Sequence, residues 1–372
     1  MKHPPFCPNP HCQYHYDELR PPHWFLHHGH YFPKYSLPVR RFKCRHCGTR
    51  FSTRTFSLDF HTKKKLPYDY IFKQLKSAAG IRDIARDLKV SANTITNRIG
   101  RLARQSQAIQ TALRARIKLN EDLVADGFES FAVSQYLPSN IHLLAGKHSQ
   151  YLYAMDYAHL ARKGRMTSAQ KRKNIRLKAL FPSGVTISRS FTRLCRNMDD
   201  ILASRTNGYT VLYTDEKPQY GPILREGQFC RSLSHVQISS EEPRTVRNDL
   251  FSVNYLDREI RKDCANHVRE TVQFSRNVNN VMERLSVYRL YHNYMKPYRI
   301  RGNPAAGIPV THGEEAGIPA GQIRKELRTL FTMRRFYHRI FRPGEEDMSL
   351  WFRTLGTPLK KNGEKVPRYL AA

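Results

Sequence analysis

The stretch LVADGFESF, residues 123–131, carries an acid, Asp126, inside a run that otherwise has the pattern of an apolar strand. A second strand-like stretch, YTVLYTD (residues 209–215), ends in Asp215 and is followed by EKP. A carboxylate within or at the tip of an apolar strand is costly unless it is paired or bound to a metal ion. Acids on two such strands therefore predict a site for a divalent cation, Mg²⁺ or Mn²⁺, where the strands meet.

Salt bridging to the abundant arginines of the chain is the simpler alternative for either acid. Asp156, in the strand-like run YLYAMD (residues 151–156), is a competing candidate for the same site. Around these stretches, residues 119–300 alternate apolar strand-like runs with helical stretches, which is typical of an α/β domain. We therefore predict one α/β domain over 119–300 that carries the carboxylates.

Upstream of this domain, residues 62–118 read as helices, and GIRDIARDLKVSANTITNRIGRLARQ (80–105) has the pattern of a helix-turn-helix. The apolar spacing after Gly80 marks one face of a first helix, and Ser91 is placed to cap a second helix. An ordinary pair of packed helices is the alternative. The exposed face of the second helix is expected to carry side chains suited to base edges and phosphates: Asn93, Thr94, Thr96, Asn97, Arg98 and Arg101.

Residues 1–61 contain two close cysteine pairs: Cys7 with Cys12, and Cys44 with Cys47. Zinc binds thiolates tetrahedrally, and a short turn closed by two cysteines presents both sulfurs to one ion. We predict a zinc ribbon in which these four residues hold a structural Zn²⁺, with buried free thiols as the alternative. Three histidines could replace a cysteine ligand, although we expect them at the surface or facing phosphates: His11, His15 and His46. The scattered cysteines read as small core residues: Cys195, Cys230 and Cys264.

The charge of the chain indicates a polyanionic partner. Its 372 residues include 63 Lys+Arg against 31 Asp+Glu, a formal net charge of +32, and residues 1–118 hold 23 of those cations and 6 of the acids. Such an excess strains a fold by self-repulsion unless a polyanion neutralises it. No apolar run approaches the roughly 18 residues of a membrane span, and the start MKHPPFCPNP lacks the apolar core of a signal peptide. We therefore expect a cytoplasmic protein whose partner is double-stranded DNA and not a membrane.

Beyond the α/β domain, residues 301–322 are rich in Gly, Pro and Ala and predict a linker. The stretch from Ile323 to Phe341 has the apolar spacing of an amphipathic basic helix, so residues 323–372 are expected to form a tethered basic helix and a tail. The predicted order is thus a zinc ribbon, a helix-turn-helix, an α/β domain, a linker and a basic helix.

These motifs, in this order, resemble a bacterial insertion-sequence transposase of the DDE class. The chain is most similar to the enterobacterial elements whose transposase arises by frameshift fusion of a small zinc-finger/helix-turn-helix protein to a DDE protein. The resemblance runs from about Cys7 to Tyr294 and rests on FKCRHCGTRF, the helix-turn-helix, VADGFESF, YTDEKPQY and IRKDCANHVRETVQFSRN. It implies a ribonuclease-H-like catalytic domain with Asp126 and Asp215 as the first two catalytic aspartates.

The third catalytic acid departs from the family's pattern, in which a glutamate on a helix is followed seven residues later by a basic residue. Matching that pattern puts the basic residue at Arg261, where it would face substrate phosphates, and the glutamate position at Asn254, which has no charge. Asp257 lies one helical turn further on the same face, and we predict that it supplies the missing carboxylate. The alternatives are Asn254 as a neutral ligand, Glu259 or another acid, and a site that no longer cuts.

The resemblance implies a DNA transposase that binds the terminal inverted repeats of its element, cleaves the strand with Mg²⁺ or Mn²⁺ and joins it to target DNA. Synapsis of two ends implies a homodimer or higher oligomer associated with the nucleoid. Two alternatives stay open. One is a catalytically inactive, domesticated transposase that acts as a sequence-specific DNA-binding regulator, and the other is a zinc-ribbon transcription factor with no nuclease ancestry.

Overall fold

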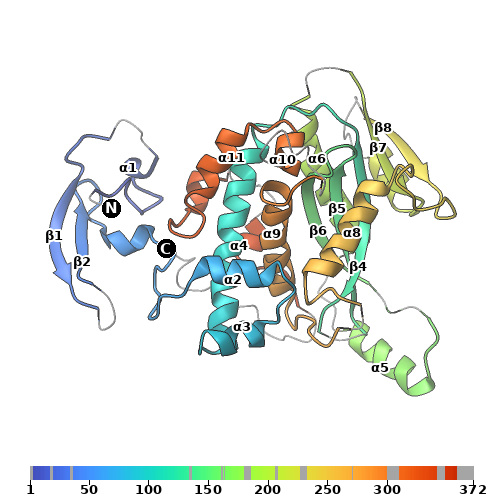
Figure 1. Ribbon diagram of the computed structural model, residues 1–372, viewed down its shortest axis with the longest axis horizontal. Coiled ribbons are helices and arrows are strands. Elements are labelled where there is room, and N and C mark those ends of the chain that lie inside the picture. Colours follow the sequence, from blue (N-terminus) through green and yellow to red (C-terminus); the bar gives the residue numbers. More distant parts are fainter. Residues whose placement is uncertain are drawn as a thin grey trace.

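The computed structural model describes residues 3–16, 20–33, 37–133, 136–160, 162, 164–179, 186–205, 208–226, 233–269, 271–299, 310–341 and 348–357. Within them the chain forms a three-stranded sheet near its N-terminus and a five-stranded mixed sheet flanked by helices (Figure 1). This mixture confirms the predicted α/β class. Among the described residues, no helix is long and apolar enough to cross a membrane.

The N-terminal module is a small antiparallel sheet of β1 (Phe25–Tyr31), β2 (Val39–Cys44) and β3 (Arg50–Ser52), accompanied by α1 (Gln13–Tyr16) and the 3-10 turn η1 (Thr53–Phe56). Its core consists mainly of the buried rings of Trp24, Phe42, Phe51 and Phe56. So few side chains bury little apolar surface, and a module of this size needs a metal ion or help from the rest of the chain.

Three helices follow: α2 (Tyr68–Leu75), α3 (Ile81–Asp87) and α4 (Ala92–Arg114). Lys89 adopts a φ of 50° in the turn after α3, and the side chain of Ser91 caps α4 by accepting a hydrogen bond from the amide of Thr94. The predicted pair of helices, with its turn and cap, is confirmed. α4 then continues well past this pair, is buried from Arg98 to Gln110, and packs against α2, α9 (Val278–Tyr294) and α11 (Ala320–Leu327).

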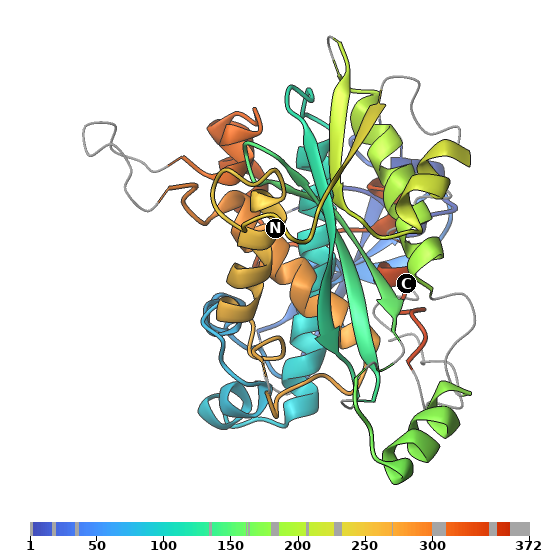
Figure 2. The same ribbon diagram turned by 90° about the vertical axis from the view of Figure 1, so that its right-hand side faces the viewer.

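The five-stranded sheet has the order β6-β5-β4-β7-β8. β4 (Leu123–Phe131), β5 (Pro138–Gly146) and β6 (Leu152–His159) pair antiparallel, whereas β7 (Thr210–Asp215) and β8 (Leu233–Ile238) run parallel to β4. α8 (Phe251–Asp263) and α9 cover one face, and α6 (Ile187–Leu202) covers the other (Figure 2). α5 (Ser168–Lys178) precedes α6, and α7 (Tyr220–Glu226) joins the two parallel strands.

The C-terminal part differs from the sequence prediction. Residues 301–309 of the predicted linker lie outside the described residues, and the rest is packed, because α10 (His312–Glu315) buries His312 against the ring of His292. The predicted helix from Ile323 to Phe341 is wrong beyond Leu327, where α11 ends. Only the short elements η3 (Tyr337–Arg339) and α12 (Met348–Trp351) follow in the described residues.

The physical reason is that the segment after α11 returns to the N-terminal module. Met333 forms a β-bridge with Ser57, and the amide of Arg334 donates a hydrogen bond to the carbonyl of Phe56 at 2.8 Å. The ring of Phe336 packs edge-on against Phe6, with 5.1 Å between the ring centroids. Extended backbone satisfies these contacts and a helix does not, so tertiary packing overrides the helical periodicity.

Candidate functional site

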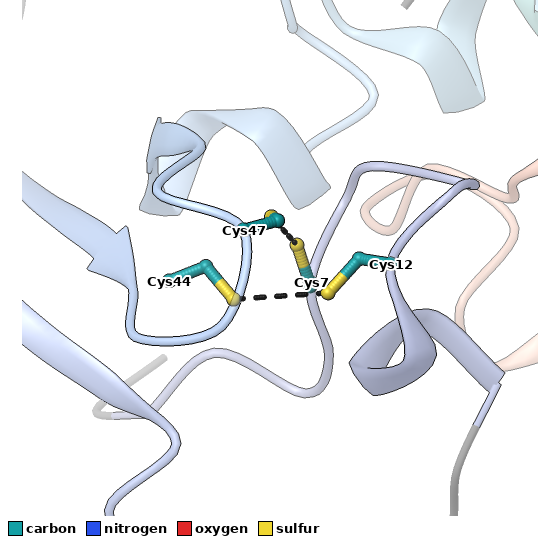
Figure 3. Close-up of side chains that lie close together, drawn as sticks. All are labelled: Cys7, Cys12, Cys44 and Cys47. Atoms are coloured by element: carbon teal, nitrogen blue, oxygen red, sulfur yellow. Dashed lines mark hydrogen bonds between the residues drawn. The ribbon is translucent and has the colours of Figure 1, made fainter.

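The four N-terminal cysteines converge beside the small sheet, and their side chains point toward one another in Figure 3. The Sγ atoms of Cys7 and Cys47 are 3.6 Å apart, and those of Cys12 and Cys44 are 3.8 Å apart. All four sulfurs lie within 4.8 Å of one another. Sulfurs bound at about 2.3 Å to a tetrahedral zinc ion are about 3.8 Å apart, so the cluster could hold a metal ion such as zinc. The predicted convergence of the two pairs is confirmed.

The neighbouring histidines surround this cluster and do not belong to it. The expectation that His15 lies at the surface is wrong: it is buried, and its Nδ1 lies 2.7 Å from the carbonyl oxygen of Cys7. The Nδ1 of His46 is 3.7 Å from the Sγ of Cys12, whereas His11 is exposed. The arrangement therefore favours four thiolate ligands over a replacement by histidine.

The remaining cysteines lie elsewhere. Cys195 and Cys264 are buried in the two apolar clusters that cover opposite faces of the five-stranded sheet, as predicted for core residues. Cys230 lies outside the described residues. Within the cluster itself, burial opposes ionisation of Cys47, but hydrogen bonds with Thr49, Cys7 and Asn9 together lower its pKa to about 6, whereas burial raises the pKa of Cys12 to about 11. The thiol of Cys47 is thus well suited to bind metal as a thiolate.

Asp126 and Asp215 lie side by side on adjacent parallel strands. The register of β4 and β7 pairs Ala125 with Thr214, so the next residue on each strand is an aspartate. The Nζ atom of Lys217 lies 3.3 Å from Oδ1 of Asp126 and 3.2 Å from Oδ2 of Asp215. Burial and the charge of Asp126 raise the pKa of Asp215. The two acids therefore share one partly buried site and one cationic side chain.

A third carboxylate, that of Asp257 on α8, is close enough to this site to interact electrostatically with Asp126. Burial, followed by the charge of Asp126, raises the pKa of Asp257 to about 7. This is expected where like charges meet in a site with little water. Asn254 lies one turn earlier on α8, and its half-buried side chain makes no hydrogen bond to Asp126 or Asp215 within the described residues. Of the two residues predicted for the third position, Asp257 is the one that interacts with another site acid.

Among the three acids of this site, one buried carboxylate oxygen has no hydrogen-bond partner in the described residues. Oδ1 of Asp215 is buried and accepts no hydrogen bond from the residues that the structure describes. Such an orphaned oxygen, in a set of oxygen-only donors, fits a hard divalent cation such as Mg²⁺ or Mn²⁺. The carboxylates are less tightly gathered than the cysteines, because within the described ranges only the cysteine cluster places three or more such ligand atoms within 4.8 Å.

The competing acids have other partners. Asp156 forms a bidentate pair with Arg193, with distances of 2.5 Å from Oδ1 to Nη2 and 2.6 Å from Oδ2 to Nε. Glu259 is bound by the ammonium groups of Lys262 and Lys296. The salt-bridge alternative therefore explains these two acids, whereas in the described part of the chain it explains Asp126 and Asp215 only through the single cation of Lys217.

The exposed face of the helix-turn-helix is smaller than predicted. Arg98 and Arg101 were expected at the surface, but they are only 4% and 5% exposed. Their guanidinium groups each donate a hydrogen bond of 2.8 Å, to the carbonyls of Lys64 and Leu58 respectively. That expectation is wrong, because residues before α2 cover this part of α4. The remaining predicted contacts are exposed or half-buried at the start of α4: Asn93, Thr94, Thr96 and Asn97.

Arg261, predicted to face phosphates, is half-buried. Its Nη2 donates to the carbonyl of Glu129 at 2.9 Å, and its guanidinium lies 4.6 Å from the ring centroid of Phe128.

The structure also shows cations that the sequence did not lead us to predict, which line a shallow hollow at the helix-turn-helix: Arg82, Arg86 and Lys89. These cations could have been predicted from the sequence, because they are the basic residues on the outer side of the first helix.

Comparison with known proteins finds no protein-family model, no curated protein and no solved structure that matches the chain. The carboxylates, the cysteine cluster and the helix-turn-helix pattern are therefore the features from which a function can be inferred.

Proposed function

We propose that this chain is a DNA transposase of the DDE class, which binds DNA ends and catalyses metal-dependent strand cleavage and strand transfer. The observation that carries the proposal is the approach of Asp126, Asp215 and Asp257 from two strands and a helix, with an unsatisfied buried oxygen on Asp215. The order of the sequence motifs and the net charge of +32 support it.

The strand order supports a ribonuclease-H-like catalytic domain. β4 is the first strand of the sheet along the chain, lies at its centre and carries Asp126. β7 lies beside it in parallel and carries Asp215. Three antiparallel strands followed by two parallel ones, with acids on neighbouring strands and a third on a covering helix, are compatible with that architecture.

In the proposed reaction, Asp126, Asp215 and Asp257 would hold Mg²⁺ or Mn²⁺. The bound ion would activate water or a 3′-hydroxyl group and stabilise the leaving oxygen of a phosphodiester. Lys217 offsets one of the two charges of the strand acids when no metal cation is present. The first turns of α4 contact the terminal inverted repeats, and the cysteine cluster, with zinc, stabilises the N-terminal module. Synapsis of two ends requires a homodimer or higher oligomer, working at the bacterial nucleoid.

A second candidate function is a sequence-specific DNA-binding regulator without catalysis. Two observations favour it: Asn254 occupies the glutamate position of the family, and the ammonium of Lys217 lies between two of the acids. In this protein, the lysine would be the permanent counter-ion of the site.

A cleavage assay separates the two. The substrate is a supercoiled plasmid that carries the DNA flanking this coding sequence, incubated with the full chain and Mg²⁺ or Mn²⁺. We expect nicking and strand transfer that fall more than about 100-fold in Asp126→Asn and Asp257→Asn. Glu129→Gln, an exposed acid on the same strand, is the matched control and retains activity. Absence of metal-dependent cleavage by the native chain would favour the regulator, and cleavage that is indifferent to Asp257→Asn would remove only this residue from the site.

A further inference from the structure

α5 has an unusual balance of charge. Its sequence, SAQKRKNIRLK, contains five lysines and arginines and no acid. The imbalance extends along the chain, because there is no aspartate or glutamate between Tyr157 and Met198. Four of the α5 cations are exposed and form no ion pair within the described residues: Lys171, Arg172, Arg176 and Lys178.

The helix is nevertheless well specified. Thr167 and Gln170 form a reciprocal capping box at its start. Leu177 is buried against Tyr136 and Leu137, and the Nζ of Lys173 lies 4.8 Å from the ring centroid of Tyr136. One side of α5 is thus fixed to the connection between β4 and β5, so its other side is held outward as a defined surface.

The position of α5 relates it to the helix-turn-helix. Figures 1 and 2 both show α5 at the margin of the molecule, beyond the end of the sheet, and at the same end as α3. α3 carries Arg82 and Arg86, two of the cations at the helix-turn-helix hollow. Two basic helices therefore lie at the same end of the protein.

We propose that α5 is a second binding surface for double-stranded DNA, which engages backbone phosphates beyond the segment bound by the helix-turn-helix. An 11-residue helix is about 16 Å long. Over that length, a duplex carries about nine phosphate charges at one per roughly 1.7 Å. Ile175 is the one large apolar side chain of α5 that is exposed, which suits a phosphate surface better than a protein interface. This inference rests on the proposed DNA-binding function.

The test compares two triple variants of the full chain that remove equal charge. One is Lys171→Gln, Arg172→Gln and Arg176→Gln on α5. The other is Arg324→Gln, Lys325→Gln and Arg328→Gln, exposed residues at α11, which lies toward the opposite end in Figure 1. Glutamine preserves helix propensity, and circular dichroism and thermal melting verify folding. Fluorescence anisotropy measures affinity for a labelled duplex of about 30 base pairs, at salt concentrations from about 50 to about 300 mM.

The slope of log K, the association constant for DNA, against log salt concentration is negative. The α5 variant should reduce the magnitude of this slope by about 2 to 3, because each lost phosphate contact removes about 0.9. The α11 variant should change it by less than about 1. Equal effects of the two variants would overturn the inference while leaving DNA binding intact. A wild-type chain that does not bind the duplex at all would overturn the proposed function instead. Unchanged DNA binding by the α5 variant, together with lost binding to phosphatidylserine vesicles, would assign the surface to a membrane and also overturn the inference.

Discussion

The Nζ atom of Lys217 lies 3.2 Å from Oδ2 of Asp215, two residues back along the chain at the end of β7. Because the same ammonium lies 3.3 Å from Asp126, one tethered cation contacts both strand acids and offsets one of their two negative charges. The site can therefore fold without a bound ion, and a divalent cation has to compete with a side chain of the protein itself.

Lys217→Gln should raise the affinity of the site for Mn²⁺ by about tenfold or more, because the two acids lose their resident cation and repel each other. Without metal, the variant should melt at a lower temperature, and Mn²⁺ should restore much of the loss. Calorimetric titration and thermal melting with and without Mn²⁺ measure both effects. Lys262→Gln removes a cation from Glu259 instead and should leave Mn²⁺ affinity unchanged. A weaker affinity in Lys217→Gln would make the lysine a contributor to metal binding and contradict the competition.

Arg101→Ala should destabilise the fold by about 1–3 kcal/mol, because it removes the buried hydrogen bond to the carbonyl of Leu58. Asn93→Ala, at the exposed start of α4, should leave stability nearly unchanged and weaken binding of the terminal DNA by about tenfold. Urea denaturation and DNA titration on both variants check this division. The division is wrong if Arg101→Ala unfolds at the wild-type urea concentration and loses only DNA binding.

Cys44→Ser should abolish zinc binding and unfold the N-terminal module, since three thiolates hold the ion less well than four. Native protein should contain about one zinc per chain, measured by mass spectrometry of the metal. Cys195→Ser is the matched control, because this cysteine is buried in the core far along the chain and should leave the zinc content unchanged. Native purified protein without zinc would exclude the structural zinc site.

Stability should fall in mild acid because of buried neutral histidines. Burial lowers the pKa of His267 to about 3 and that of His312 to about 4. As pH falls below about 6.5, the unfolded chain takes up protons that the folded chain cannot. Each of the two then removes about 1.4 kcal/mol of unfolding free energy per pH unit, until its folded pKa is reached.

Urea denaturation between about pH 7 and pH 4.5 tests this dependence. His267→Asn should give a plot of unfolding free energy against pH that is less steep than the wild-type plot, by the contribution of one histidine. His30→Asn, at an exposed position of β1, serves as the control and should keep the wild-type steepness. Equal steepness in wild type and His267→Asn would show that His267 gains its proton in the folded state.

Glu283→Gln should cost about 3–5 kcal/mol of stability, because it leaves two buried or partly buried arginines without their counter-charge. Oε1 of Glu283 lies 3.0 Å from Arg104 on α4, and Oε2 lies 2.6 Å from Arg353. Asp83→Asn breaks an exposed pair with Arg86 and should cost less than about 1 kcal/mol. Chemical denaturation of the two variants gives both values, and similar losses would contradict a structural role for the buried triad.

The features predicted correctly from the sequence are those set by local chemistry. The spacing of the cysteine pairs and the cap at Ser91 depend on neighbours only a few residues away. The proximity of Asp126 and Asp215 could be anticipated because each acid interrupts an apolar strand. The burial of Arg98 could not be predicted in this way. Its guanidinium donates to the carbonyl of Lys64, a residue outside the helix, and the spacing of residues within a helix gives no information about such a partner. The error beyond Leu327 has the same origin, since Phe336 fits helical spacing but packs against Phe6.

The return of Phe336 to the aromatic core of the N-terminal module has a consequence for biosynthesis. Phe6 and Phe56 leave the ribosome early, whereas their partner ring follows only after most of the chain has been translated. At about 5–20 residues per second, the interval is on the order of tens of seconds. During that time, Phe6 and Phe56 have only the ring contacts within the module, and a metal ion held by the four cysteines would help to keep the nascent module folded. The supply of that metal during translation, and not only in the finished protein, would then affect how much of the chain reaches its native state.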